Sequence, residues 1–237
     1  MSMPRRLETE LLDILPADDP EATGSRRDLR LVNRLMFSAA LVARHLKAQY
    51  RGRPVPKSLL DLGAGDGTLT LALAKRLSAS WPDVEVTLLD RQNLLSPSTR
   101  HGFANLGWNA TPVTADVFAY LGSARKEAYD IVIANLFLHH FGQDDLARLL
   151  ALIARVTSCF VALEPRRAQF PLGMSHLLWA IGCNRVTRHD AVASVRAGFV
   201  GRELSQLWPR DMGWHLTEME AWPFSHCFSA RHDGTDP

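Results

Sequence analysis

Short apolar stretches alternate with amphipathic stretches through the middle of the chain. Residues 69–77 and 144–150 place apolar side chains at helical spacing, which predicts two helices. Five other stretches are short and apolar, as is typical of buried strands: 58–60, 84–89, 113–118, 129–135 and 159–163. A chain that alternates strand and helix in this way predicts a parallel sheet with right-handed crossovers.

The N-terminal region has a helical pattern without strands. Residues 7–15 predict a short amphipathic helix, and the proline-containing stretch 16–24 predicts a loop. Residues 25–28 have the form of a capping box. A long helix is therefore predicted to begin at Ser25 and to continue to Leu46.

A glycine-rich run, DLGAGDGT at residues 61–68, separates the first predicted strand from the first predicted helix of the core. Its glycines let the backbone turn sharply and approach a ligand closely, next to the unpaired N–H groups of a helix start. The spacing is GxGxG, whereas the dinucleotide-binding fingerprint is GxGxxG. Asp61 and Asp66 would repel a pyrophosphate, so the run favours a cationic ligand.

Further polar residues follow the next strands. Asp90 lies roughly 20 residues beyond the glycine run, where a βαβ unit places a ribose-binding acid. Asp116 is predicted to close the third strand, and Asn135 ends the fourth. Because parallel strands end at one edge of a sheet, these side chains are expected to meet in one crevice.

With four motifs in this order, the chain resembles the class I, Rossmann-like S-adenosylmethionine-dependent methyltransferases, of the small-molecule type, over residues 57–165. The resemblance implies S-adenosylmethionine as cofactor, with one acid on the ribose hydroxyls, another on the adenine amino group, and the end of the fourth strand near the methyl group. The positions that match this cofactor site are Asp61, Gly63, Ala64, Gly65, Asp90, Arg91, Asp116, Val117 and Asn135.

The resemblance also implies the fold: an α/β, doubly wound, seven-stranded and mostly parallel sheet with an antiparallel C-terminal hairpin. Residues 214–222 and 225–230 match the hairpin. We expect a helical N-terminal cap at 1–52 and a cofactor-binding core at 53–165 and 211–237. Residues 166–210 exceed what the core needs, so we expect a helical insertion that acts as a lid over the acceptor.

Three helices are predicted within this insertion. They are 169–181, closed by Gly182; 191–197, opened by a capping box at 187–190 and closed by Gly198; and 201–207. The insertion holds seven arginines against two acids, which is explained by solvated helix faces or by an anionic acceptor. His176, Trp179, Phe199 and Trp208 either line the acceptor pocket or form a small core.

Composition adds limits on other functions. The chain has 237 residues, 46% of them hydrophobic, enough for one elaborated domain. A net charge of +2 argues against a nucleic-acid partner. Three widely spaced cysteines argue against disulfides and against a zinc site, so we expect no metal and a cytoplasmic location. We expect no signal peptide and no membrane association; a homodimer is possible.

Two histidines stand where the chemistry is expected. His139 and His140 follow the fourth strand, at the edge where open α/β sheets bind ligands. Either could be the general base for a hydroxyl acceptor, although one of the two adjacent side chains is expected to pack or cap instead. In the family, a helix before the first strand often covers the methionine end of the cofactor, so Arg30, Asn33 and Arg34 are candidates for its carboxylate.

The leading prediction is methyl transfer to a small-molecule acceptor, with oxygen favoured as the acceptor atom. The run after the fourth strand lacks the Asn/Asp-Pro-Pro-aromatic motif of base N-methyltransferases, and no cysteine lies between Gly67 and Cys159 to serve cytosine C5 chemistry. An rRNA or ribose methyltransferase stays open. So do an NAD-dependent oxidoreductase and a non-catalytic S-adenosylmethionine-binding protein.

Overall fold

The computed structural model describes residues 3–16, 18–126, 128–210, 213–221 and 223–233. Its sheet has seven strands in the order β3-β2-β1-β4-β5-β7-β6. β1 to β5 run parallel, and β7 pairs antiparallel with both β5 and β6, which confirms the predicted sheet and hairpin. The strands are β1 Ser58–Leu62, β2 Glu85–Asp90, β3 Asn109–Thr114, β4 Ile131–Asn135, β5 Cys159–Pro165, β6 Trp214–Ala221 and β7 Ser225–His232.

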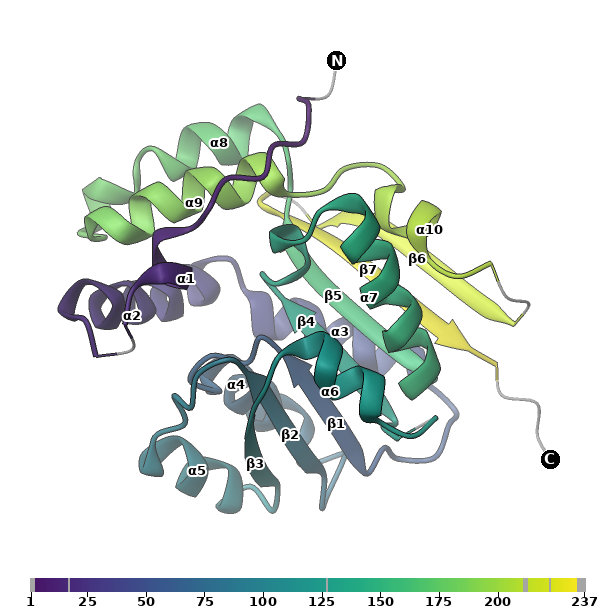
Figure 1. The fold of residues 1–237 in the computed structure, drawn as a ribbon. Coiled ribbons are helices and arrows are strands. Elements are labelled where there is room, and N and C mark those ends of the chain that lie inside the picture. Colours follow the sequence, from purple (N-terminus) through teal and green to yellow (C-terminus); the bar gives the residue numbers. More distant parts are fainter. Residues whose placement is uncertain (1–2, 17, 127, 211–212, 222, 234–237) are drawn as a thin grey trace.

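Helices cover both faces of the sheet (Figure 1). Buried side chains of α3, α4 and α5 pack on one face, and those of α6, α7 and α10 pack on the other. These helices are α3 Ser38–Gln49, α4 Thr68–Leu77, α5 Pro97–Ala104, α6 Val117–Ser123, α7 Gln143–Val156 and α10 Glu203–Leu207. The doubly wound α/β arrangement therefore follows from strands that are apolar toward both layers.

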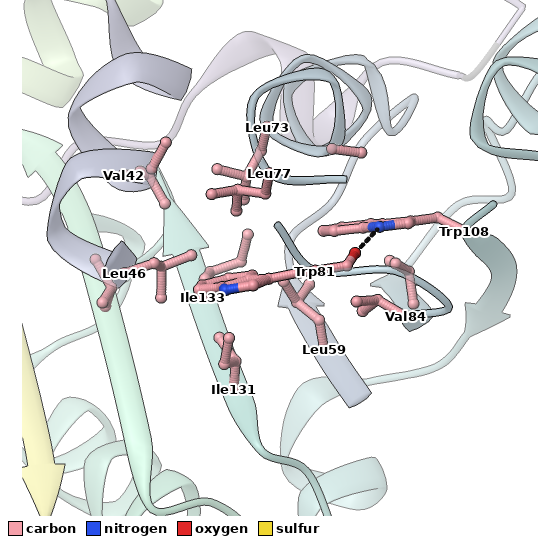
Figure 2. Packing of buried hydrophobic residues seen from close by; sticks show 14 of the residues in the cluster. Val42, Leu46, Leu59, Leu73, Leu77, Trp81, Val84, Trp108, Ile131 and Ile133 are labelled. Atoms are coloured by element: carbon pink, nitrogen blue, oxygen red, sulfur yellow. Dashed lines mark hydrogen bonds between the residues drawn. The ribbon is translucent and has the colours of Figure 1, made fainter. Parts of the chain in front are cut away.

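The first of these two layers is packed around large aromatic side chains (Figure 2). Leu59 of β1 and Ile133 of β4 face α3 and α4, while Trp81 fills the space beyond the end of α4. The Trp108 indole N–H donates to the Trp81 carbonyl at 2.8 Å, so burial leaves that polar atom satisfied. This core fixes β1 and β4, whose carboxyl ends carry the site.

The N-terminal helices differ from the prediction. The first is only one turn, α1 Leu11–Ile14, and the second, α2 Pro20–Leu35, begins five residues before Ser25. Asp19 caps α2, because its carboxylate accepts from Glu21 and Ala22 N–H groups and Pro20 suits the first helical position. The predicted long helix is also broken at Phe37, whose φ of 55° ends one helix and starts α3.

The other boundary errors have similar local causes. The third strand ends at Thr114, and Asp116 caps α6 instead of closing the strand. In the insertion, α8 Gln169–Ser175 and the 3₁₀ turn η2 Leu178–Ile181 replace one helix. α9 Arg185–Ala197 is capped by Asn184, three residues before the predicted box begins. Gly182 and Gly198 end η2 and α9 as predicted, while Trp222 lies outside the described residues.

The N-terminal region and the insertion pack on each other above the carboxyl ends of the parallel strands (Figure 1). Residues 3–15, here called the N-terminal strap, cross α9. Arg5 donates to the carbonyls of Ala197, His139 and Phe141, and Asp190 of α9 accepts from two strap N–H groups. The strap is thus fixed to α9 and to the loop after β4.

Two further features concern membrane-spanning helices and the cysteines. No helix among the described residues is long and apolar enough to cross a membrane. All three cysteines are free and buried, as expected of small apolar side chains.

Candidate functional site

A cavity of about 530 Å³ opens where β1, β2 and β4 end. Thirteen of the fourteen residues predicted for the site line it: Asp61, Gly63, Ala64, Gly65, Asp90, Arg91, Asp116, Val117, Asn135, Asn33, Arg30, His139 and His140. Arg34 is absent from its lining. The cavity has two parts, which we call the glycine-loop half (residues 61–68, Asp90 and Asp116) and the histidine half (Glu10, Asp13, His139 and His140).

Two glycines shape the glycine-loop half. Gly63 has a φ of 68°, and a Cβ there would stand 2.3 Å from the Phe137 ring, so no larger residue fits. Gly65 has a φ of 56°, but an added Cβ would meet no atom within 4 Å. Since Gly65 lines the cavity, its bare backbone leaves space that a ligand can occupy.

Asp90 organises this loop. One carboxylate oxygen accepts from the Gly65 N–H at 2.9 Å, and the other accepts from the Gln92 N–H at 2.9 Å. An ionised carboxylate keeps further lone pairs for a ligand after two such bonds. Asp90 therefore both holds the glycine loop and faces the cavity.

Asp61 is buried behind the loop, with 2% of its surface exposed. Its carboxylate accepts a short hydrogen bond from the Thr70 hydroxyl of α4. Burial raises the pKa of the Asp61 carboxyl to about 7, an effect that the Thr70 hydrogen bond partly offsets. Asp61 thus links β1 to α4 through this hydrogen bond. With a pKa of about 7, its carboxyl group at the base of the cavity changes between the neutral and the ionised form near neutral pH.

Asp66 has two partners. It accepts from the Thr68 N–H at 3.1 Å, and the Arg30 guanidinium lies 2.6 Å away. Asp116 accepts from the Phe118 and Ala119 N–H groups as the cap of α6, with Arg91 at 3.9 Å. Both acids combine a local structural role with a position on the cavity wall.

Asn135 ends β4 with an unsatisfied atom. Its Nδ2 donates to Asn33 Oδ1 of α2 at 3.1 Å, so the predicted covering helix does reach the end of β4. Asn135 Oδ1 is buried and has no hydrogen-bond partner among the described residues. A buried acceptor without a partner is costly, so this oxygen is a fit for a donor group on a bound ligand.

The histidine half is built on the 3₁₀ turn η1 Leu138–His140. Glu164, near the end of β5, is fully buried and accepts from the backbone N–H groups of Phe137 and Leu138 at 3.0 and 2.8 Å. It also contacts His139 Nδ1 at 2.7 Å. One buried carboxylate thereby orders the whole turn after β4.

His139 lies between two carboxylates. Its Nδ1 faces Glu164, and its Nε2 lies 3.2 Å from Glu10 of the N-terminal strap. Burial lowers the pKa of the His139 imidazole, but hydrogen bonds and charge from Glu10 and Glu164 outweigh it and raise that pKa to about 9. Burial raises the pKa of the Glu10 carboxyl, but its hydrogen bonds with His139 and Ser194 and the nearby imidazole charge outweigh that effect and hold the pKa below its usual value. At neutral pH His139 is an imidazolium held in an ion pair.

His140 has a different environment. Its side chain is 25% exposed, and its Nδ1 lies 3.2 Å from Asp13 of the strap. The two imidazole rings are 4.3 Å apart and tilted by 32°, and both line the cavity. His139, buried between Glu10 and Glu164, is the one of the two histidines that packs, as expected, although both side chains contribute to the lining of the cavity.

Glu10, His139 and His140 each offer a potential ligand atom within 4.8 Å of the others, a spacing that a metal ion could bridge. These three side chains are already partnered without an ion: Glu10 contacts His139 and Ser194, His139 also contacts Glu164, and His140 contacts Asp13.

Four residues of the site were not predicted from the sequence and reach it from three distant segments: Glu10, Asp13, Glu164 and Ser194. Glu164 had the best signal, as an acid at the carboxyl end of a buried strand. Of residues 166–210, Ser194 alone lines the cavity. Phe199 and Trp208 instead belong to the core between the sheet and helices α6, α7 and α10, while His176 and Trp179 are exposed.

Comparisons with known proteins agree with this geometry. A family model described as a methyltransferase domain matches residues 59–158. No curated protein matches the sequence. The fold is similar to that of the plantazolicin methyltransferase BamL, solved with a desmethylPZN analog and SAH, at 15% identity over 91% of this chain and 92% of that one, with a TM-score of 0.66.

Two further structures extend this likeness. The plantazolicin methyltransferase BpumL, solved with SAH, is 16% identical over 91% of both chains, with a TM-score of 0.63. A candidate O-methyltransferase from Nostoc punctiforme is 12% identical over 96% of this chain and 64% of that one, with a TM-score of 0.59.

Proposed function

From the premise that this chain carries a class I, S-adenosylmethionine-dependent methyltransferase domain, we propose that it transfers the methyl group to oxygen of a small-molecule acceptor. The observation that supports this most is the joint presence, in one cavity, of the glycine loop with Asp90 and of a partly exposed histidine paired with an acid. The first suits the cofactor and the second suits a hydroxyl.

The glycine-loop half suits S-adenosylmethionine. Asp90 is proposed to accept from the ribose hydroxyls, and Asp116 from the adenine amino group. The unpartnered Asn135 Oδ1 would accept from the ammonium group of the methionine end, beside Asn33. Arg30 is already bound to Asp66, so we assign it to the wall of the cavity and not to the methionine carboxylate.

In the histidine half, one residue is proposed to accept the proton of the acceptor and others to hold that residue in place. When bound, S-adenosylmethionine supplies a methyl group already activated by its sulfonium. We assign the base to His140, which takes the acceptor's hydroxyl proton as the new carbon–oxygen bond forms and the carbon–sulfur bond breaks. Asp13 orients that imidazole. His139, already protonated, positions the turn and does not act as the base.

An apolar wall beside the histidines supports an aromatic acceptor. Phe141 packs edge-on against both Phe137 and Phe118, with ring centroids 5.2 and 5.6 Å apart, and all three line the cavity. Such rings favour offset or edge contacts with another ring. The acceptor we propose is therefore a small phenol.

The alternatives fit less well. A dinucleotide would place its pyrophosphate next to Asp61 and Asp66, and Arg30, the basic residue paired with Asp66, is already engaged by that carboxylate. A ribose of rRNA would need a basic approach surface, whereas the histidine half carries Glu10, Asp13 and Asp145. A sensor that binds the cofactor without turnover stays possible only if no acceptor reacts. A cytoplasmic location is proposed from the three free cysteines.

The test is formation of S-adenosylhomocysteine from S-adenosylmethionine with matched series of phenols and benzylamines. We expect turnover with phenols, and a loss of about 10²- to 10⁴-fold in kcat for His140→Gln. The control His189→Gln changes a half-exposed histidine that lies outside the cavity and should keep the wild-type rate. Turnover with amines alone would overturn the oxygen assignment. Cofactor binding without turnover on any acceptor would favour the sensor.

A further inference from the structure

A second groove lies on the surface, apart from the methyltransferase cavity. It is open, has a volume of about 550 Å³ and shares no lining residue with the first cavity. Four basic residues line it, here called the groove cations: Arg44, Lys47, Arg51 and Arg76. The rest of its lining is alanine, so no acid and no aromatic ring faces it among the residues that the structure describes.

The groove cations lie on the outer side of two packed helices, and all four are exposed. Arg44 and Lys47 are three residues apart on α3, and Arg51 follows four residues later, just beyond the end of that helix. Such spacings place side chains on one face. Arg76 joins them from the last turn of α4, which packs against α3. The opposite faces of both helices pack on the sheet, where Figure 2 shows Leu46 of α3.

The groove cations lack the acidic partners that arginines of the insertion have. There, four arginines form ion pairs with glutamates: Arg166, Arg167, Arg185 and Arg196. In the described part of the chain, no groove cation makes an ion pair or a side-chain hydrogen bond. Like charges three or four residues apart on a helix repel each other, so the groove has an electrostatic cost that a bound anion would remove.

Helix dipoles explain only part of this arrangement. Lys47 and Arg76 stand in the last turns of α3 and α4, where a cation is favourable. Arg44 lies in the middle of α3, too far from either end to gain from that effect. The small side chains of Ala40 and Ala48 leave the space beside the cations open. The groove therefore offers an anion both charge and room.

The lining also indicates which kind of anion fits. A guanidinium group matches phosphate oxygens with two parallel N–H donors, and the groove has three such groups. Among its described lining residues there is no aromatic ring on which a nucleic-acid base could stack. Nor is there a large apolar side chain that could enter a bilayer or anchor a protein partner. A compact molecule with several phosphate charges suits these features best.

We propose that this groove binds a small molecule that carries a diphosphate or triphosphate group. Arg44, Arg51 and Arg76 would donate to the phosphate oxygens, and Lys47 would add a fourth positive charge. The site is separate from the methyltransferase cavity, and the inference goes beyond the proposed function without depending on it.

Calorimetric titration with sodium tripolyphosphate tests the site. We expect saturable binding that weakens as salt is raised. Arg44→Gln combined with Arg76→Gln should lower the affinity about tenfold, because charge-assisted contacts with phosphate are lost. The control combines Lys75→Gln with Arg100→Gln, which removes the same formal charge from exposed side chains outside the groove, one of them next to Arg76 on α4. This control should bind as wild type.

Thermal unfolding provides a second readout. A ligand that binds only the folded protein raises its Tm, so tripolyphosphate should raise the Tm of the wild type and of the control more than that of the groove variant.

Several outcomes would overturn the proposal. Absence of wild-type binding, or equal losses in the two double variants, would show that the groove does not recognise phosphate. Competition by S-adenosylhomocysteine would place the anion in the first cavity instead. Groove-dependent binding of an oligouridylate, or of phosphatidylglycerol vesicles, that is tighter than binding of tripolyphosphate would assign the groove to RNA or to a membrane.

Discussion

The two halves of the cavity use carboxylates in different ways. In the glycine-loop half, Asp90 and Asp116 accept from backbone N–H groups of the loops around them. In the histidine half, Glu10, Asp13 and Glu164 pair with imidazole rings. Backbone amides do not titrate, whereas imidazoles do. Above neutral pH, the contacts of Asp90 and Asp116 with backbone amides are therefore expected to persist, whereas the imidazole pairs of the histidine half depend on their protons.

The halves also differ in the chain segments that build them. Asp90 reaches the glycine loop from 25 residues away, whereas Glu10 reaches His139 from 129 residues away. The N-terminal strap that carries Glu10 is held to α9 through Asp190 and Arg5. Completion of the histidine half thus requires that strap and insertion both dock on the core.

The largest expected effect is at Glu164. Glu164→Gln removes a buried charge from His139 and should destabilise the protein by about 3–5 kcal/mol, as breaking a buried ion pair does. Chemical denaturation measures this. Glu220→Gln, which alters a half-exposed acid paired with Arg166, should cost less than about 1 kcal/mol. Equal costs would mean that the histidine half is not held by its buried carboxylate.

The next largest expected effect is the pH dependence of stability, which reports on the histidine half of the cavity. The pKa of His139 is raised from 6.5 to about 9 in the fold, so its contribution is complete below pH 6.5 and is lost as pH rises through about 9. The free energy of unfolding should fall by on the order of 3 kcal/mol over that window.

A substitution tests whether His139 causes this dependence of the unfolding free energy on pH. His139→Asn should flatten the dependence of unfolding free energy on pH, while His189→Asn, an exposed histidine outside the cavity, should keep it. A wild-type slope that persists in His139→Asn would place the titrating group elsewhere and contradict the electrostatics of the histidine half.

The smallest effect concerns the glycine loop. Gly65→Ala and Gly182→Ala both put a Cβ at a positive φ with no atom within 4 Å, so each should lose about 1 kcal/mol of stability. Only Gly65 lines the cavity. We expect S-adenosylhomocysteine affinity to fall about tenfold in Gly65→Ala alone. Equal affinities in the two variants would show that the ligand does not approach this loop.

The glycine-loop half could be predicted from the sequence because its residues follow consecutive strands. The GxGxG run, Asp90 and Asn135 each sit at a strand end, and parallel pairing brings strand ends together whatever the helix boundaries are. The family resemblance gave the seven-stranded, mostly parallel sheet and its antiparallel C-terminal hairpin, and the structure confirms both. The end of the third strand was predicted too late in the chain, but the prediction that Asp116 lies at the cavity is unaffected, because Asp116 lines it from the start of α6.

The histidine half could not be predicted in the same way. Its acids come from the strap and from β5, and their approach depends on tertiary packing of the strap on α9. The N-terminal helices were misplaced for a local reason: the cap at Asp19 preceded a plausible box at Ser25. The role of residues 166–210 as an acceptor lid stays a prediction; in the structure they reach the cavity through Ser194.

The central claim is that the glycine-loop half binds S-adenosylmethionine through Asp90. Calorimetry with S-adenosylmethionine, S-adenosylhomocysteine and NAD tests it directly, using wild type, Asp90→Asn and Asp145→Asn. Asparagine can still accept from the Gly65 N–H, so the loop should persist, while loss of the charge should weaken binding of the first two ligands by about 30-fold.

Asp145 lines the same cavity near the histidines, so Asp145→Asn should change these affinities by less than about threefold. We expect saturable binding of S-adenosylmethionine and S-adenosylhomocysteine, weakened only by Asp90→Asn, and no heat with NAD. Binding of NAD, or equal losses in the two variants, would contradict it.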